Sequence, residues 1–257
     1  MSIPDYLLQT LKSSLFILGG GLLPLLAAAF VMQIIANILR KLLRTRLGNG
    51  YIYLTAPGVM LHELGHAFFC LVFRHKIIEM KLFEPDDNGT LGYVLHTYNP
   101  NSLYQRIGNF FIGTGPVWGG LAALVLLSHL LLPSTMLEGN GAMEQIQHFF
   151  SGLLSSAFWK NWQSWLWIYL SLAIVSHITL SPPDLKGAGD GFCAIVLTVL
   201  LANLLFGWCG NWAEHVWHYE LALLSRCSTL MITILILNAV CILPGMALAM
   251  ILPRATR

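Results

Sequence analysis

Long apolar stretches alternate with short polar segments along the chain. Crossing a bilayer takes about 20 residues for roughly 30 Å of hydrocarbon, and several stretches reach that length. They cover residues 13–39, 51–73, 107–132, 162–183, 191–213 and 227–252. Backbone groups in hydrocarbon must form hydrogen bonds within their own segment, so each stretch is expected to be a helix. The pattern predicts an all-α polytopic membrane protein with about six transmembrane helices, in a single membrane-embedded domain over residues 1–257.

The connection over residues 74–106 has a different pattern. In IIEMKLFEP, the apolar residues Ile78, Met80 and Leu82 alternate with other residues at the period of a β-strand. An Asn-Gly turn signal at residues 88–89 separates this segment from a second one, TLGYVLHTY. The sequence therefore predicts a small membrane-associated β-hairpin in this loop, between the second and third transmembrane helices.

Composition supports a membrane protein and excludes two other classes. The chain is 56% hydrophobic and only 10% charged, whereas soluble domains carry about 25% charged residues. The net charge of +2 comes without any block of like charge, so no nucleic-acid partner is expected. The five cysteines form no CxxC pair, and we interpret them as packing residues rather than a disulfide framework or zinc knuckle.

The basic residues give a prediction of orientation. With six spans, more Lys and Arg residues fall on the side of the two termini than on the opposite side, although the basic loop at 40–46 argues the other way. The balance predicts a multi-pass protein of the cell membrane with both termini in the cytoplasm. The oligomeric state is not indicated by the sequence.

The second apolar stretch contains three ionisable residues in HELGH, residues 62–66. On a helix, His62 and His66 lie one turn apart on the same face, so both imidazoles can reach one zinc ion at about 2 Å. Glu63 lies beside them, where its carboxylate can take a proton from water. Each such residue in a membrane helix costs about 3 kcal/mol or more, which indicates a function. The motif predicts a Zn²⁺ site with His62 and His66 as metal ligands and Glu63 as the catalytic base.

A catalytic zinc site needs a third protein ligand. The segment HITLSPPDLKGAGDG, residues 177–191, offers two candidates. Its two consecutive prolines must break a helix and leave Asp184 at the break, among free backbone groups. Asp190 precedes the fifth apolar stretch and also fits a helix cap. We favour Asp184 as the metal ligand, with Asp190 as the alternative, and interpret His177 as a hydrogen-bonded helix contact.

Three segments resemble motifs of the site-2 protease family of intramembrane zinc metalloproteases. HELGH at 62–66 is similar to the HExxH motif of the family's first core helix, and GTGPVWGG at 113–120 to its glycine-proline motif. SPPDLKGAGDG at 181–191 resembles the Asn-Pro…Asp-Gly element that supplies an aspartate ligand. The resemblance covers about residues 51–191 and implies a catalytic core of three helices around zinc. It also implies that the 74–106 loop guides substrate and that the site faces the cytoplasm.

Two of the three motifs depart from the family pattern. Ser181 stands where the third motif begins with asparagine, and both candidate aspartates compete for the ligand position. Gly119 and Gly120 stand where the family often has asparagine, so the side chain that positions substrate is not identified. Gly115 and Gly119 are also spaced to let a neighbouring helix approach closely.

Together these residues predict a zinc-dependent intramembrane endopeptidase that hydrolyses peptide bonds in or near transmembrane segments. The expected partners are a membrane-protein substrate and the lipid bilayer. One alternative is a metal or proton transporter, which would have a polar trail and inverted repeats, and neither is evident here. Another is a non-catalytic membrane scaffold with a structural zinc, which would hold its metal with four protein ligands.

Overall fold

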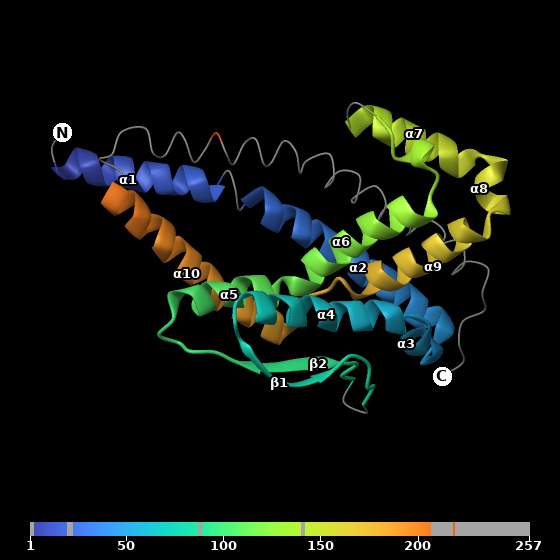
Figure 1. The fold of residues 1–257 in the computed structure, drawn as a ribbon, viewed down its shortest axis with the longest axis horizontal. Helices are drawn as coiled ribbons and strands as arrows, with labels where there is room; N and C mark the ends of the chain where they lie inside the picture. The colour runs from blue at the N-terminus through green and yellow to red at the C-terminus, as the bar shows by residue number, and fades with distance from the viewer. Residues whose placement is uncertain (1–2, 20–22, 87–88, 140–141, 207–217, 219–257) are drawn as a thin grey trace.

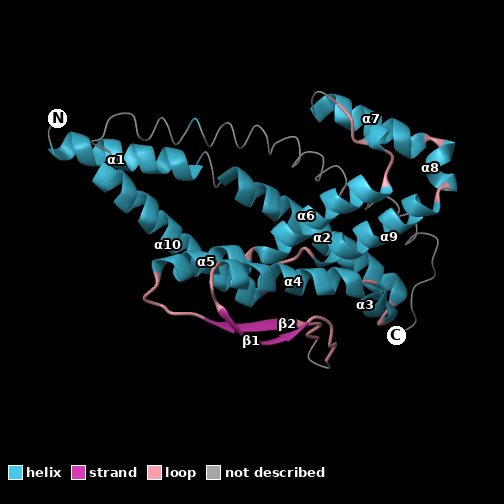
Figure 2. Ribbon diagram, viewed as in Figure 1, coloured by secondary structure: helices cyan, strands magenta, loops and turns pink. Residues whose placement is uncertain are grey.

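The computed structural model describes residues 3–19, 23–86, 89–139, 142–206 and 218. They form a mostly helical chain with one two-stranded antiparallel sheet, as predicted (Figure 1 and Figure 2). The first elements are α1 (Ile3–Ile17), α2 (Leu23–Leu47), α3 (Gly50–Leu54), α4 (Ala56–Val72), β1 (Lys76–Lys81) and β2 (Tyr93–Thr97). They are followed by α5 (Leu103–Gly113), α6 (Gly115–Leu131), η2 (Ser134–Met136), α7 (Ala142–Leu154), α8 (Ser156–Lys160), α9 (Trp162–His177) and α10 (Pro182–Phe206).

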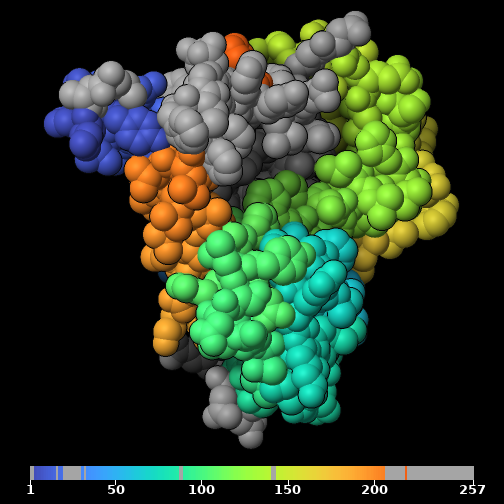
Figure 3. All heavy atoms as spheres, turned by 60° about the vertical axis from the view of Figure 1, so that its left-hand side comes forward, coloured from blue at the N-terminus to red at the C-terminus, as the bar shows by residue number. Residues whose placement is uncertain are grey.

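Helix α4 has neighbours on several sides. It packs against α5, α6 and α9, and against both strands of the hairpin (Figure 1). A buried apolar cluster, which includes Leu39, Leu124 and Val175, joins α2, α6 and α9 behind it. Helix α10 packs along α5 and also contacts α1, as Figure 3 shows. The helix that carries HELGH and the helix that carries Asp184 are therefore both held by α5.

Glycines allow α4 to approach α6 at backbone distance. A Cβ atom added to Gly65 would lie 2.6 Å from the carbonyl oxygen of Gly115, and one added to Gly115 would lie 2.7 Å from that of Gly65. A Cβ atom on Gly119 would lie 3.3 Å from the Cα atom of Gly65. The close helix packing predicted from the Gly115 and Gly119 spacing is confirmed.

The prediction of six long spanning helices is wrong for the residues that the structure describes. One helix in this part of the chain, Pro182–Leu205, is long and apolar enough to cross a membrane. A second span results if Leu103–Gly113 and Gly115–Leu131, which meet at a 58° bend, are counted together. The predicted sixth span, 227–252, and the end of the fifth lie outside the described residues.

Local breaks divide the apolar stretches, which explains the difference. The stretch 51–73 is split into α3 and α4 at Thr55, and α4 has 17 residues. The stretch 162–183 is divided in the same way: α9 ends at His177, and the last two residues of the stretch already belong to α10, which begins at Pro182. Proline is well tolerated in the first turn of a helix, where its missing N–H is not needed. The two prolines thus begin a helix as well as separating it from the preceding one.

The hairpin is confirmed, with shorter strands than the sequence predicts. Strands β1 and β2 pair antiparallel, with Ile77 opposite His96 and a bulge between Ile77 and Glu79. Gly89 has a φ of 86°, a left-handed conformation that suits glycine. The bulge takes one residue out of the alternation, and Ile78 is 58% exposed. Asn88, the first residue of the predicted Asn-Gly turn, lies outside the described part of the chain.

Candidate metal centre

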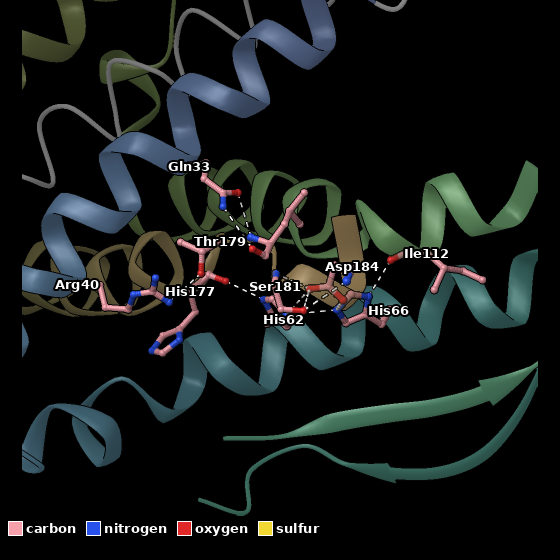
Figure 4. Close-up of polar contacts among 10 residues, drawn as sticks. Gln33, Arg40, His62, His66, Ile112, His177, Thr179, Ser181 and Asp184 are labelled. Carbon is pink, nitrogen blue, oxygen red and sulfur yellow. Dashed lines mark hydrogen bonds and ion pairs between the residues drawn. The ribbon is translucent and has the colours of Figure 1, made fainter. Parts of the chain in front are cut away.

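Three predicted ligand side chains converge between α4 and α10 (Figure 4). The Nε2 atoms of His62 and His66 are 3.2 Å apart, and His66 Nε2 is 3.3 Å from Oδ1 of Asp184. His62 Nε2 is 3.9 Å from the other carboxylate oxygen of Asp184. Donors about 2.0–2.1 Å from a tetrahedral zinc ion would be roughly 3.3 Å apart. The group has the spacing that one metal ion requires, and it could hold one.

Backbone carbonyls hold both histidines in the tautomer that a metal needs. His62 Nδ1 donates a hydrogen bond of 2.8 Å to the carbonyl oxygen of His177, and His66 Nδ1 donates one of 2.7 Å to Ile112. A neutral imidazole with its proton on Nδ1 has an unprotonated Nε2. Two such nitrogens at 3.2 Å cannot bond to each other, whereas a cation between them would bind both lone pairs. The donor chemistry therefore fits a metal ion.

Asp184 lies in the first turn of α10, where a capping box fixes its side chain. Its Oδ2 accepts hydrogen bonds from the backbone N–H of Ser181 at 2.8 Å and from the Ser181 hydroxyl at 2.7 Å. The Asp184 N–H in turn donates to Ser181 Oγ at 3.4 Å. Gly113 lets this turn approach α5, because a Cβ atom there would clash with the Asp184 carbonyl oxygen. The carboxylate is thus held with Oδ1 free to face His66.

The structure brings Asp184, and not Asp190, to the two histidines. Asp190 is exposed within α10 and does not belong to the metal-binding group. Six residues further along a helix, a side chain is about 9 Å away along the axis and roughly 240° around it. The interpretation of Asp190 as a cap of the fifth helix is also wrong, because α10 begins eight residues earlier, at Pro182.

Helix α2 supports the segment that joins α9 to α10. The Gln33 side-chain amide donates to the carbonyl oxygen of Leu180 at 3.3 Å and accepts from its N–H at 3.0 Å. Arg40 donates to the hydroxyl of Thr179 at 3.0 Å. The carbonyl that orients His62 belongs to the last residue of α9, directly before this segment, and the serine that orients Asp184 lies within the segment. Helix α2 therefore acts on the site although it contributes no ligand.

Glu63 lies in the same cavity as the three ligands. The cavity has a volume of about 560 Å³ and is also lined by residues of β2 and of the loop before it. Glu63 is 6% exposed, and its Cγ atom would be 2.9 Å from a Cβ atom added to Gly92. The hairpin backbone thus lies directly against the glutamate, which lines the cavity.

No protein-family model, curated protein or solved structure matches this chain.

His177 behaves as a helix contact, as predicted. Its Nε2 atom is 2.8 Å from the hydroxyl of Thr55, and its ring stacks on Tyr51 at 5.8 Å between centroids. The side chain therefore ties α9 to α3 and to the start of α4. Its contribution to the site comes from the backbone carbonyl that accepts from His62.

Several groups at the site were missed from the sequence. Ser-Pro-Pro-Asp is a signal for an N-cap, proline in the first turn and a capping acid, and it would have identified Ser181. Asn109 is 6% exposed and lines the cavity, and a polar residue inside the apolar stretch 107–132 is a recognisable signal. His96 also lines the cavity, but its position in the hairpin gives no sign of this. The two carbonyl acceptors have no sequence signal at all.

Proposed function

We propose that the chain is a zinc-dependent endopeptidase that hydrolyses peptide bonds in or near transmembrane segments of membrane proteins. The observation that carries the proposal is the single cavity containing His62, His66 and Asp184 together with the buried Glu63. A metal held only for structure has no use for a buried glutamate that lines the same cavity. The resemblance of three sequence segments to the site-2 protease family supports the same reaction.

Zinc suits this donor set. Two imidazole nitrogens and one carboxylate are typical of catalytic zinc sites, which keep a fourth position open. An all-oxygen set would favour magnesium or calcium, and a thiolate set would favour a closed structural site. Zinc held here would polarise a scissile carbonyl and lower the pKa of a water molecule to about 7.

Glu63 has the role of the proton carrier in this proposal. Its carboxylate takes a proton from the attacking water, and the same group then delivers that proton to the nitrogen of the leaving amine. One C–N bond breaks, one C–O bond forms, and Glu63 returns to its starting state. Burial and the neighbouring hairpin backbone hold the carboxylate in place.

The outer face of α4 supports a membrane location. Met60, Leu64, Phe68 and Leu71 follow one another at intervals of three or four residues, and each is between 39% and 70% exposed. Large exposed apolar surfaces on a protein mark contact with another protein or with lipid. The ligands point inward from the same helix. We propose that this face contacts lipid, in a protein of the cell membrane with both termini in the cytoplasm.

The test replaces the proton carrier and leaves the ligands intact. Full-length protein is purified in detergent, loaded with zinc and incubated with fluorescein-labelled β-casein, an unfolded chain whose carbonyls need no unwinding. In Glu63→Gln, we expect the wild-type amount of bound zinc and a loss of cleavage of about 10²–10⁴-fold, the contribution of a general base. Glu84→Gln, which changes an exposed glutamate of the hairpin loop, serves as the matched control and should cleave normally.

Other outcomes assign other functions. Zinc bound without any cleavage, in wild type and variant alike, would indicate a scaffold. Zinc or proton flux across vesicles that contain the protein, again without cleavage, would indicate a transporter. Equal cleavage by the wild type and by Glu63→Gln would contradict the role of Glu63.

A further inference from the structure

A second histidine pair connects the hairpin to the cavity. His75 and His96 face each other with their Nδ1 atoms 3.1 Å apart, and their ring centroids are separated by 5.1 Å. His96, on β2, lines the cavity that contains the three ligands and Glu63. His75 is 4% exposed and does not line it. The pair therefore has one buried member and one that borders the proposed substrate space.

The backbone fixes His75 firmly. Helix α4 ends in a Schellman motif, in which the His75 N–H donates to the Cys70 carbonyl at 2.8 Å and the Arg74 N–H donates to Leu71 at 3.1 Å. Arg74 takes the left-handed position of this motif, with a φ of 58°. Tyr98 stacks on the His75 ring at 5.0 Å with an interplanar angle of 15°. Little freedom is left for the ring.

Hydrogen bonding then dictates which nitrogen of each ring carries the proton. His75 Nε2 is 2.9 Å from the carbonyl oxygen of Gln105, which can only accept, so this nitrogen is protonated. In neutral His75, Nδ1 is then an acceptor, and His96 Nδ1 must donate to it. Neutral His96 is left with an unprotonated Nε2. Burial lowers the pKa of His75, and burial together with His75 lowers that of His96, which favours both neutral forms.

This chain of hydrogen bonds orients His96 and does not conduct protons. It ends at the Gln105 carbonyl, which has no proton to release and none to exchange. The Gln105 side chain also donates to Arg74 O at 2.7 Å and accepts from Asn99 N at 2.6 Å, so it joins the start of β1 to the end of β2. These contacts hold the His96 ring in one orientation and in one tautomer.

We infer that His96 is a substrate-binding residue whose Nε2 accepts a hydrogen bond from a main-chain N–H of the bound peptide, and that His75 is its positioning residue. The inference rests on the proposed peptidase function. Backbone N–H groups are the donors that every extended peptide offers, whatever its sequence. An acceptor that lines the same cavity as the ligand group would therefore align a peptide without selecting its side chains.

Two substitutions of His96 separate its contact with His75 from its proposed contact with the peptide. His96→Asn keeps an amide N–H where Nδ1 bonds to His75 but has no atom in place of Nε2. A neutral hydrogen bond contributes about 0.5–1.5 kcal/mol, so KM for labelled β-casein should rise by up to about tenfold while kcat changes little. His96→Gln, whose amide oxygen reaches toward the place of Nε2, should restore part of the loss. His75→Leu should raise KM as His96→Asn does, although its side chain lies outside the cavity.

Histidine ¹⁵N spectra of the zinc-loaded protein in lipid nanodiscs give a readout independent of activity. The signals that vanish in His96→Asn should show a protonated Nδ1 and an unprotonated Nε2. Unchanged KM in His96→Asn, with cleavage by the wild type intact, would overturn the inference alone, and so would a protonated Nε2 on His96. Absence of cleavage by the wild type would instead defeat the proposed function, and the substrate role of His96 with it.

Discussion

Residues outside the candidate metal-binding group hold its three side chains toward one another. The Nδ1 protons of His62 and His66 are held by the carbonyls of His177 and Ile112. One carboxylate oxygen of Asp184 is held by Ser181, which leaves the other for His66. Groups around a site that orient its ligands typically change metal affinity by about 10–100-fold. The most accessible of these groups to mutation is Ser181, because the other two are backbone atoms.

Ser181→Ala should weaken metal binding without removing a ligand. The substitution deletes the hydroxyl that donates to Asp184 Oδ2 at 2.7 Å, so the carboxylate gains freedom to turn away. We expect zinc affinity to fall by about 10-fold or more, measured by competition with a chromophoric chelator. Asp184→Asn should lose more, whereas Asp190→Asn should bind zinc like the wild type. A loss in Asp190→Asn equal to that in Asp184→Asn would contradict the assignment of the ligand.

The sequence alone identified the site residues that lie close together along the chain. His62, Glu63 and His66 lie within five positions of one helix, where the helical repeat alone places them on one side. The choice between Asp184 and Asp190 depended on where α10 begins and how it rotates against α5, and nearby residues could only favour one. His96 and Asn109 depend on a hairpin folding back over α4, so their place in the cavity follows from tertiary contacts alone.

At the scale of elements, the distance between α4 and α6 sets the frame of the site. The two backbones meet at Gly65 and Gly115, and Gly65 lies between the two histidine ligands in sequence. Any increase in this distance would also move His66 relative to Ile112 on α5. The close packing of α4 against α6 therefore also fixes the position of the histidine ligands.

Gly65→Ala should therefore destabilise the fold. Its Cβ atom would lie 2.6 Å from the Gly115 carbonyl oxygen, so the helices must separate. Overpacking of this kind costs about 1–3 kcal/mol, and the midpoint of thermal unfolding in detergent should fall accordingly. Gly189→Ala is the matched control, because nothing lies within 4 Å of the added atom in α10. That variant should be stabilised by about 0.5–1 kcal/mol, as expected for glycine in a helix. A neutral Gly65→Ala would show that the two helices are not tightly packed.

The element boundaries were the weakest part of the sequence prediction. Apolar content measures the length of a stretch but not where its helix breaks, and here Thr55, Thr114 and the segment after His177 interrupt three stretches. Polar side chains of one helix satisfy backbone groups at such a break, as Gln33 does for Leu180. Those partners come from distant parts of the chain, which a pattern along one stretch does not contain.

The whole molecule places polar and apolar groups on opposite sides of α4. Its inner side carries the ligands and Glu63, whereas its outer side carries the exposed stripe from Met60 to Leu71. In water such a stripe would be an aggregation hazard, and in lipid it would be the favoured surface. A single substitution on this face can therefore show whether it contacts water or lipid.

Leu64→Lys tests the surroundings of the molecule directly. Leu64 is 44% exposed and lies midway along α4, where a lysine has the longest way to reach water. On the lipid side, the substitution should cost about 2.5–3.5 kcal/mol of insertion free energy. We expect a large decrease in the fraction of protein that stays in membranes after alkaline carbonate extraction, whereas Leu64→Met should match the wild type. In water, the lysine would be tolerated and the protein would keep its zinc. If the Leu64→Lys variant accumulates normally and binds zinc, the proposed membrane location is wrong, whereas the proposed metal centre is unaffected.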